Sequence, residues 1–172
     1  NGQVPTQADI AAGFDGCGNL RLLENTRVMN WNLRNQLSEV RPVVRESGLD
    51  DSEYYIYDSD GLRLRKIRSV QTNVRTVTSE TRYLPGLEVR MNKASGETLY
   101  VINTEAGRNG VQVLCWKDSP PSGVVNRQYR YTLGDHLGSS TLELDSQAKV
   151  IRRETYHPFG TLAISEAGDS SE

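Results

Sequence analysis

The fold of this chain follows from the stretch Tyr57-Asp58-Ser59-Asp60-Gly61-Leu62-Arg63, in which strand-forming residues run into a tight turn. The side chain of Asp58 can accept hydrogen bonds from backbone N–H groups, and Gly61 can adopt the positive φ that such a turn requires. Aromatic and β-branched residues precede the turn at 54–57, and apolar and charged residues alternate after it at 62–65. The stretch therefore predicts a β-hairpin.

The same frame occurs in two earlier copies: an aromatic residue, Asp or Asn, two free positions, Gly or Asn, and a pair that usually contains leucine. These copies are Phe14-Asp15-Gly16-Cys17-Gly18-Asn19-Leu20 and Trp31-Asn32-Leu33-Arg34-Asn35-Gln36-Leu37. Each predicts one hairpin whose aromatic side chain packs on the neighbouring strand. Isolated hairpins are marginally stable in water, so such units gain stability by stacking edge to edge. The repeat predicts an all-β chain of consecutive antiparallel hairpins in an elongated or spiralling sheet.

Further strands are indicated downstream, and no long helical pattern interrupts them. Residues 87–91 and 98–102 flank one turn, 110–116 and 128–133 flank a double-proline break, and 140–144 and 150–156 flank a longer loop. Residues 165–172 are small and acidic without periodicity. We therefore expect one repeat segment over residues 1–163 and a disordered acidic tail over 164–172.

The composition excludes several classes of partner. The formal net charge is −2, from 20 basic and 22 acidic residues, so no overall field attracts nucleic acid or an anionic membrane. No apolar run is long enough to span a membrane, and Asn1-Gly2-Gln3-Val4-Pro5 has neither the basic nor the apolar region of a signal peptide. Only 36% of the residues are hydrophobic, which is a thin supply for a compact globule. The chain is expected to need neighbours.

Candidate catalytic and metal-binding groups are few. Asp135, His136 and Ser139 have triad chemistry, but neighbouring residues of a strand point to opposite faces, so we expect Asp135 or Ser139 to cap a turn instead. Cys17 and Cys115 lie too far apart in the sequence for a zinc knuckle and are expected to be reduced thiols. We predict no catalytic centre, no cofactor and no metal site, and Asp58 with Asp60 is expected to be a solvated turn pair.

A basic cluster and a set of aromatic residues leave two alternatives open. The cluster is Arg63, Arg65, Lys66, Arg68 and Arg75, and strand alternation places Arg63 and Arg65 together on the face opposite Leu62 and Leu64. It could contact nucleic acid or an acidic cargo, but a sheet face paired with nearby carboxylates is favoured because no aromatic platform is interleaved. The aromatic residues favour cross-strand packing, with a glycan-binding surface as the alternative.

The frame resembles the YD repeat of Rhs and teneurin proteins, with Tyr57-Asp58 as the matching pair. Longer stretches across residues 14–163 resemble the Rhs-associated core region of the C component of bacterial insecticidal toxin complexes. They are Trp31-Asn32-Leu33-Arg34-Asn35-Gln36-Leu37, Tyr83-Leu84-Pro85-Gly86-Leu87-Glu88, the stretch from Asp135 to Asp145, and Tyr156-His157-Pro158-Phe159-Gly160. The structural motif residues are thus Phe14, Asp15, Gly18, Trp31, Asn32, Tyr57, Asp58, Gly61, Tyr83, Pro85, Gly86, Asp135, His136, Gly138, Tyr156, Pro158 and Gly160.

The resemblance implies a wall segment of a hollow shell. Family members build a spiralling β-sheet shell with a B component around an unfolded toxin polypeptide, so other Rhs segments, a B-component-like protein and the toxin are the implied partners. The family's self-cleaving carboxylates follow the core region, whereas this chain continues into Thr161-Leu162-Ala163-Ile164 and the acidic tail. The implied function is non-catalytic encapsulation and delivery of the toxin. The resemblance also implies that the chain is secreted as part of a toxin complex. A cell-surface or glycan-binding module is the alternative function.

Overall fold

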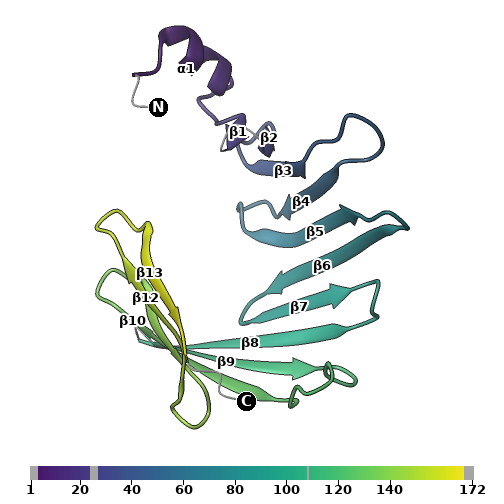
Figure 1. Cartoon of the computed structure of the whole chain (residues 1–172). Helices are drawn as coiled ribbons and strands as arrows, with labels where there is room; N and C mark the ends of the chain where they lie inside the picture. Colours follow the sequence, from purple (N-terminus) through teal and green to yellow (C-terminus); the bar gives the residue numbers. More distant parts are fainter. Residues whose placement is uncertain (1–3, 24–26, 108, 169–172) are drawn as a thin grey trace. The chain divides into compact units, whose positions relative to one another are not determined.

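The computed structural model describes residues 4–23, 27–107 and 109–168. Within these ranges it contains one short helix and thirteen strands, which follow one another in chain order from β1 to β13 in an antiparallel sheet (Figure 1). The expected all-β class of consecutive hairpins is confirmed. Two compact units are distinguished: an N-terminal unit reaching Tyr83 together with Asn92–Gly96, and a C-terminal unit of Leu84–Met91 and the residues from Glu97 onward.

The N-terminal unit is a succession of strands that each pair with the next. Their order follows local turn chemistry, and their register brings Tyr55 opposite Lys66 and Ile67 opposite Glu80. Its most buried side chains are charged, namely Glu39 and Glu80. The strands are β1 (Leu22–Leu23), β2 (Arg27–Trp31), β3 (Leu37–Val43), β4 (Asp51–Tyr57), β5 (Arg63–Gln71) and β6 (Thr76–Leu84).

The C-terminal unit holds the apolar core. Val101, Leu114 and Trp116 are buried on one face of the sheet, with Leu99 and Val124 packed against them. These are β-branched, aliphatic and aromatic residues at alternate strand positions, which is the pattern of a half-buried strand. The strands are β7 (Leu87–Asn92), β8 (Thr98–Ala106), β9 (Asn109–Trp116), β10 (Gln128–Gly134), β11 (Ser140–Leu144), β12 (Val150–Tyr156) and β13 (Leu162–Ala167).

The connection between β9 and β10 is held down by one asparagine. Asn126 accepts a hydrogen bond from Trp116 N at 2.8 Å through Oδ1 and donates from Nδ2 to Trp116 O at 3.1 Å. The indole of Trp116 also donates to Glu97 Oε1 at 2.7 Å. The double-proline break predicted from the sequence is therefore a loop that folds over the core.

Helix α1 (Gln7–Gly13) was not anticipated from the sequence. It begins with a capping box, in which the Thr6 hydroxyl accepts from Asp9 N and Asp9 Oδ2 accepts from Thr6 N at 2.8 Å. Thr6 followed three residues later by an acidic residue is the signal that could have predicted it. No helix in the described ranges has the length and apolar character of a transmembrane segment.

The end of the chain differs from the expected tail. Strand β13 spans Leu162–Ala167 and pairs along its length with β12, for example Ile164 with Thr155. The expected boundary after residue 163 therefore falls inside a strand. Ladder hydrogen bonds with β12 continue past Ile164 through Ser165, Glu166 and Ala167, since backbone groups supply them. Residues 169–172 of the expected tail lie outside the described residues.

Candidate interaction site at the repeated turns

One five-residue turn recurs six times among the described residues. In each copy the N–H of the first residue donates to the C=O of the fifth at 2.8 to 3.0 Å, and the N–H of the fourth donates to the C=O of the first at 2.8 to 3.4 Å. Three copies are the predicted repeats, and the other three lie in the C-terminal unit. The turns are residues 15–19, 32–36, 58–62, 135–139, 145–149 and 157–161.

The first residue of the turn explains the requirement for Asp or Asn. Its Oδ1 atom accepts from the backbone N–H groups of the third and fifth residues at 2.8 to 3.1 Å. This geometry satisfies two donors that the strand ladder cannot reach. It holds for Asp15, Asn32, Asp58, Asp135 and Asp145, whereas His157 occupies the position in the sixth turn.

The fourth residue adopts a left-handed conformation in every copy. Glycine occupies the position in four turns, with φ between 81° and 87°, and Asn35 and Ala148 occupy it with φ of 57° and 61°. Glycine and asparagine tolerate this region, whereas alanine is strained there. The positive φ predicted at Gly18 and Gly61 matches this geometry, and Gly138 and Gly160, which the sequence indicated only as motif residues, share it.

Five of the six turns, all except residues 15–19, are each followed by a β-bulge. After the third turn Tyr57 pairs with Arg63, but Ile56 pairs with Arg65, so Leu64 is an extra residue. Arg63 therefore stacks its guanidinium 4.5 Å from the centroid of the Tyr55 ring, while Arg65 lies on the opposite face with Glu80. The expectation that Arg63 and Arg65 share a face was wrong, because the bulge shifts the alternation by one residue.

Aromatic residues that precede the turns link one repeat to the next. Trp31 Nε1 donates to Leu20 O at 2.8 Å, and Tyr57 OH donates to Leu37 O at 2.9 Å. Leu20 and Leu37 are each the residue that follows the preceding turn. Trp31 and Tyr57 therefore each satisfy a backbone carbonyl beside the turn of the preceding repeat.

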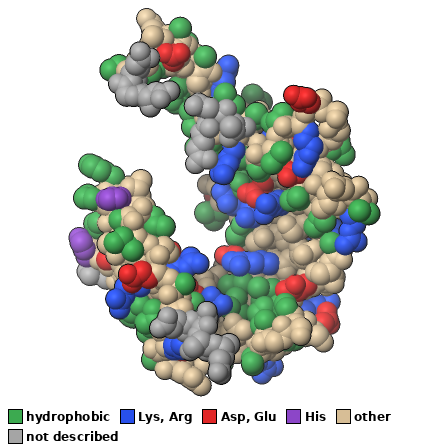
Figure 2. All heavy atoms as spheres, viewed as in Figure 1, with side chains coloured by type: hydrophobic (Ala, Val, Ile, Leu, Met, Phe, Trp, Pro, Cys, Tyr) green, Lys and Arg blue, Asp and Glu red, His purple; other side chains and the backbone are tan. Residues whose placement is uncertain are grey.

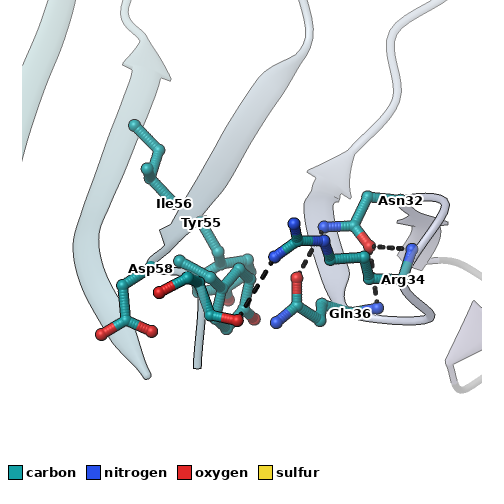
Figure 3. Close-up of a pocket in the computed structure, with 8 residues that line it drawn as sticks. Asn32, Arg34, Gln36, Tyr55, Ile56 and Asp58 are labelled. Atoms are coloured by element: carbon teal, nitrogen blue, oxygen red, sulfur yellow. Dashed lines mark hydrogen bonds between the residues drawn. The ribbon is translucent and has the colours of Figure 1, made fainter. Parts of the chain in front are cut away.

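The second and third turns border an open groove of about 560 Å³. Asn32, Arg34 and Gln36 extend from one turn toward the end of β4, as Figure 3 shows, and Arg34 donates to Ser59 O at 3.4 Å. Asn32 also donates to Gln36 Oε1 at 2.9 Å. The amides of Asn32 and Gln36 therefore bond to each other within their own turn, and the guanidinium of Arg34 links this turn to the next one.

Charged residues of the N-terminal unit pair both within strands and across them. Glu80 Oε1 accepts from Arg65 Nε at 2.9 Å and from Arg82 Nε at 2.8 Å, and the hydrogen bond from Arg82 is the main cause that lowers the pKa of Glu80. Burial alone would raise the pKa of Glu39, but hydrogen bonds from Arg41 and Asn30 outweigh it and the pKa is lowered. Red and blue side chains lie side by side in Figure 2. The basic cluster is thus partly paired with carboxylates, as expected.

Asp135, His136 and Ser139 form a turn and not a relay. Asp135 Oδ1 accepts from Leu137 N and Ser139 N, each at 2.9 Å, and the bond from Ser139 is the main cause of the lowered pKa of Asp135. The expected capping role is confirmed. Cys17 and Cys115 are free cysteines. Within the described ranges no three His, Cys, Asp or Glu side chains are grouped as metal ligands.

Comparison with individual known proteins identifies the family of the chain. No family model matches it. It is 36% identical over 167 residues to toxin subunit YenC1 and 39% identical over 161 residues to toxin subunit YenC2, both of Yersinia entomophaga, which covers 95% and 91% of this chain. This chain is of the Rhs/YD-repeat type, similar to toxin-complex C subunits. It spans 17% of the length of these two relatives.

Solved structures agree with this Rhs/YD-repeat assignment. The crystal structure of TcdB2-TccC3 superimposes with a TM-score of 0.85 at 40% identity, covering 94% of this chain and 8% of the other. The Photorhabdus luminescens Tc holotoxin pore gives a TM-score of 0.86 at 39% identity, with the same coverage. The resemblance inferred from the motifs is therefore confirmed.

The remaining motif residues of the Rhs/YD-repeat chain lie in turns and strands. Pro85 and Gly86 follow β6, where Gly86 has a φ of 68° and accepts a hydrogen bond from Asn103 N at 2.8 Å. Tyr83 lies half-buried in β6, and Tyr156 OH donates to Glu154 at the end of β12. The turn at Asp145 was expected to be a longer loop. Asp145 at the first position, with strand β12 beginning directly after the fifth residue of the turn, is the signal that could have assigned this turn to the repeat.

Proposed function

We propose that this chain is a non-catalytic part of an Rhs-repeat shell that encapsulates a toxin polypeptide and helps to deliver it. The observation that carries the proposal is similarity to toxin subunits along more than nine-tenths of the chain, together with a sheet assembled from one repeated hairpin. A wall built from repeated hairpins encloses the toxin polypeptide by its shape and needs no reactive group. The proposal treats residues 1–163 as the repeat segment and extends it through β13 to Ala167.

The polar residues of the motif support a structural role. Asp15, Asn32, Asp58 and Asp135 all direct their side-chain oxygens to backbone N–H groups of their own turns. A catalytic carboxylate or amide would instead face an open site where a substrate can reach it. We therefore propose that the chain is not an enzyme.

The proposed partners are other Rhs-repeat segments, a B-component-like shell protein and the enclosed toxin polypeptide. Similar solved proteins are TcdB2-TccC3 complexes, which supports this choice. Edge strands favour such assembly, since each presents unpaired backbone groups to a further strand. Within the complex the chain would act outside the producing cell.

Size-exclusion chromatography with light scattering tests the proposal on the full chain, alone and after mixing with a B-component-like protein. Assembly into a larger species with that protein, and protection of a co-expressed toxin polypeptide from protease, are the expected results. A chain that remains a monomer in the mixture and leaves the toxin polypeptide open to protease would refute it. Binding to a glycan array by such a monomer would favour the surface-module alternative.

A further inference from the structure

Two arginines flank the open groove beside the second and third turns. Arg34 extends from the second turn, and Tyr55 and Tyr57 line the groove at the end of β4 (Figure 3). Tyr57 is paired with Arg63 of β5, and the guanidinium of Arg63 lies 4.5 Å from the centroid of the Tyr55 ring. We name this place the arginine groove and define it by Arg34, Tyr55, Tyr57 and Arg63.

The bulge after the third turn creates this arrangement. In the sequence no aromatic residue is interleaved with the basic cluster. Tyr55 and Tyr57 are two positions apart on β4 and therefore share a face of the sheet. Because Leu64 is an extra residue, Arg63 falls on that same face and Arg65 falls on the other one. Strand pairing thus brings a cation and two aromatic rings together beside the groove.

Both guanidinium groups of the arginine groove have donors to spare. Arg34 and Arg63 are exposed residues. The Arg34 guanidinium donates to Ser59 O at the long distance of 3.4 Å, and that of Arg63 stacks on the Tyr55 ring. Neither forms an ion pair with a carboxylate of the described residues, whereas other arginines of this unit bind buried carboxylates. Several N–H donors of each planar fork are therefore open to a partner.

The remaining polar groups of the groove already have partners. The hydroxyls of Tyr55 and Tyr57 donate to Glu53 and to Leu37 O, and the side-chain amides of the second turn bond to each other. Asp58 accepts from N–H groups of its own turn through Oδ1, and in Figure 3 its carboxylate points away from the second turn. A ligand of the groove must therefore satisfy mainly the two guanidinium groups, which favours acceptor atoms with negative charge.

We propose that the arginine groove binds an acidic segment of a partner polypeptide, with one carboxylate on Arg34 and another on Arg63. The planar fork of a guanidinium matches a carboxylate in a bidentate pair. The turn that carries Arg34 leads into β3, and β3 is separated from β5 by two strand spacings, or about 10 Å. An extended chain covers about 10 Å in three residues. Two acidic residues with two others between them therefore fit the groove.

Nucleic acid fits the arginine groove less well than an acidic peptide. Single strands bind where aromatic rings are free to stack on bases, and the Tyr55 ring is covered by Arg63. The formal net charge of −2 provides no wider field that attracts phosphates. Asp58 and Asp60 of the third turn would repel a long polyanion, whereas a short segment can be held between the two arginines.

Fluorescence anisotropy on the full chain at low salt tests the proposal, with a labelled Gly-Glu-Ser-Ser-Glu-Gly peptide as the probe. Arg34→Gln and Arg63→Gln are expected to weaken binding by roughly fivefold each, because each removes one exposed charge pair. Arg63→Lys should restore only part of the loss, since an ammonium group lacks the planar fork. A peptide with glutamine in place of both glutamates should not bind.

The matched control is Arg75→Gln, which removes the same charge from the turn beyond the far end of β5. The nine residues of this strand place Arg75 roughly 25–30 Å from Arg63, so binding should be unchanged. Circular dichroism confirms that each variant is folded. If loss of the stacked Arg63 prevents folding, Arg34→Gln changes only an exposed turn residue and provides the same test.

The inference is overturned if the wild-type chain does not bind the acidic peptide. It is also overturned if Arg75→Gln weakens binding as much as Arg34→Gln, because the attraction would then be unspecific. Tighter binding of a single-stranded oligothymidine than of the peptide, lost in both Arg34→Gln and Arg63→Gln, would assign the groove to nucleic acid instead. Assembly of the shell and protection of the toxin polypeptide are measured separately, so these outcomes leave the proposed function standing.

Discussion

At the scale of single residues, the fourth position of the repeated turn is where a residue departs from its preferred backbone conformation. Ala148 occupies it with a φ of 61°, where the other turns have glycine or asparagine. A left-handed conformation costs a residue with a Cβ atom about 1–2 kcal/mol. Glycine avoids this cost, but part of the gain in stability is offset because glycine is more flexible in the unfolded chain. Ala148→Gly is therefore expected to raise the free energy of unfolding by about 0.5–1 kcal/mol, measured by urea denaturation.

The control for this change is Ser146→Gly in the same turn. Ser146 does not have a positive φ, so glycine there should lower the stability or leave it unchanged. Equal effects of the two substitutions would contradict the assignment of strain to residue 148.

The aspartate at the first position of the turn predicts that the free energy of unfolding depends on pH. Hydrogen bonds from Ser139 N and Leu137 N lower the pKa of Asp135 in the folded chain. A lowered folded pKa contributes stability above the unfolded pKa of about 4, and this contribution is lost as the pH falls through the folded value. Asp135→Asn retains the acceptor oxygen without the charge, as Asn32 shows. The wild-type chain should be more stable than this variant at pH 6, and the difference should shrink as the pH falls below the unfolded pKa and through the lower folded pKa of Asp135.

Thermal unfolding of both proteins between pH 2.5 and 7 measures this dependence. Asp118→Asn, in the loop after β9, is the control. A constant difference between wild type and Asp135→Asn over the whole range would show that the carboxylate charge is unimportant in the turn.

At the scale of elements, the contribution of an ion pair to the free energy of unfolding is predicted to depend on the burial of its carboxylate. The side chain of Glu80 is 5% exposed and binds Arg65 and Arg82, whereas the side chain of Glu88 is 25% exposed and binds Arg90. Glu80→Gln should lower the free energy of unfolding by roughly 1 kcal/mol, since both arginines still reach water, and Glu88→Gln by less than about 0.5 kcal/mol. Urea denaturation at low and high salt measures both, and equal losses would contradict the prediction.

The pairing of β12 with β13 depends on a glycine. A Cβ atom at Gly168 would lie 1.7 Å from Val150 O, and Gly168 N donates to Ile151 O at 2.8 Å. Gly168→Ala must therefore separate the ends of these strands. Amide hydrogen exchange in β13 is expected to accelerate by roughly tenfold or more. Ser165→Ala, an exposed change in the same strand, is the control, and unchanged exchange in Gly168→Ala would disprove the close approach.

The sequence predicted most elements because their turn signals are local. Asp58 and Gly61 were sufficient to place β4 and β5, whereas the strands on either side of Asp145 were placed around an expected longer loop. The second half of strand β13 was missed because Ser165, Glu166 and Ala167 carry no apolar alternation, although their backbone still pairs. Helix α1 was missed because one short capping box is a weak signal among many turns.

At the scale of the whole molecule, stability is predicted to be uneven. The buried apolar cluster lies in the C-terminal unit, whereas the most buried residues of the N-terminal unit are Glu39 and Glu80. Each unit contains one tryptophan, Trp31 or Trp116. In a sheet where each strand contacts mainly the next, regions can unfold separately. Trp31 fluorescence should therefore report a lower urea midpoint than Trp116 fluorescence.

Single-tryptophan variants, Trp116→Phe and Trp31→Phe, separate the two signals. Circular dichroism of each variant is the control that the substitution itself has not moved the transition. Coincident midpoints in both variants and in circular dichroism would show that the chain unfolds as one cooperative unit.

The sequence by itself determined the all-β class, the hairpins and the capping role of Asp15, Asn32, Asp58 and Asp135. These features depend on hydrogen bonds within five consecutive residues, which composition and spacing specify. Only the tertiary structure decided which face each side chain occupies. The bulge at Leu64 separates Arg63 from Arg65, and the register of β5 with β6 places Glu80 beside Arg65. A shift of one residue exchanges the two faces of a strand, and that shift depends on pairing with residues far away in the sequence.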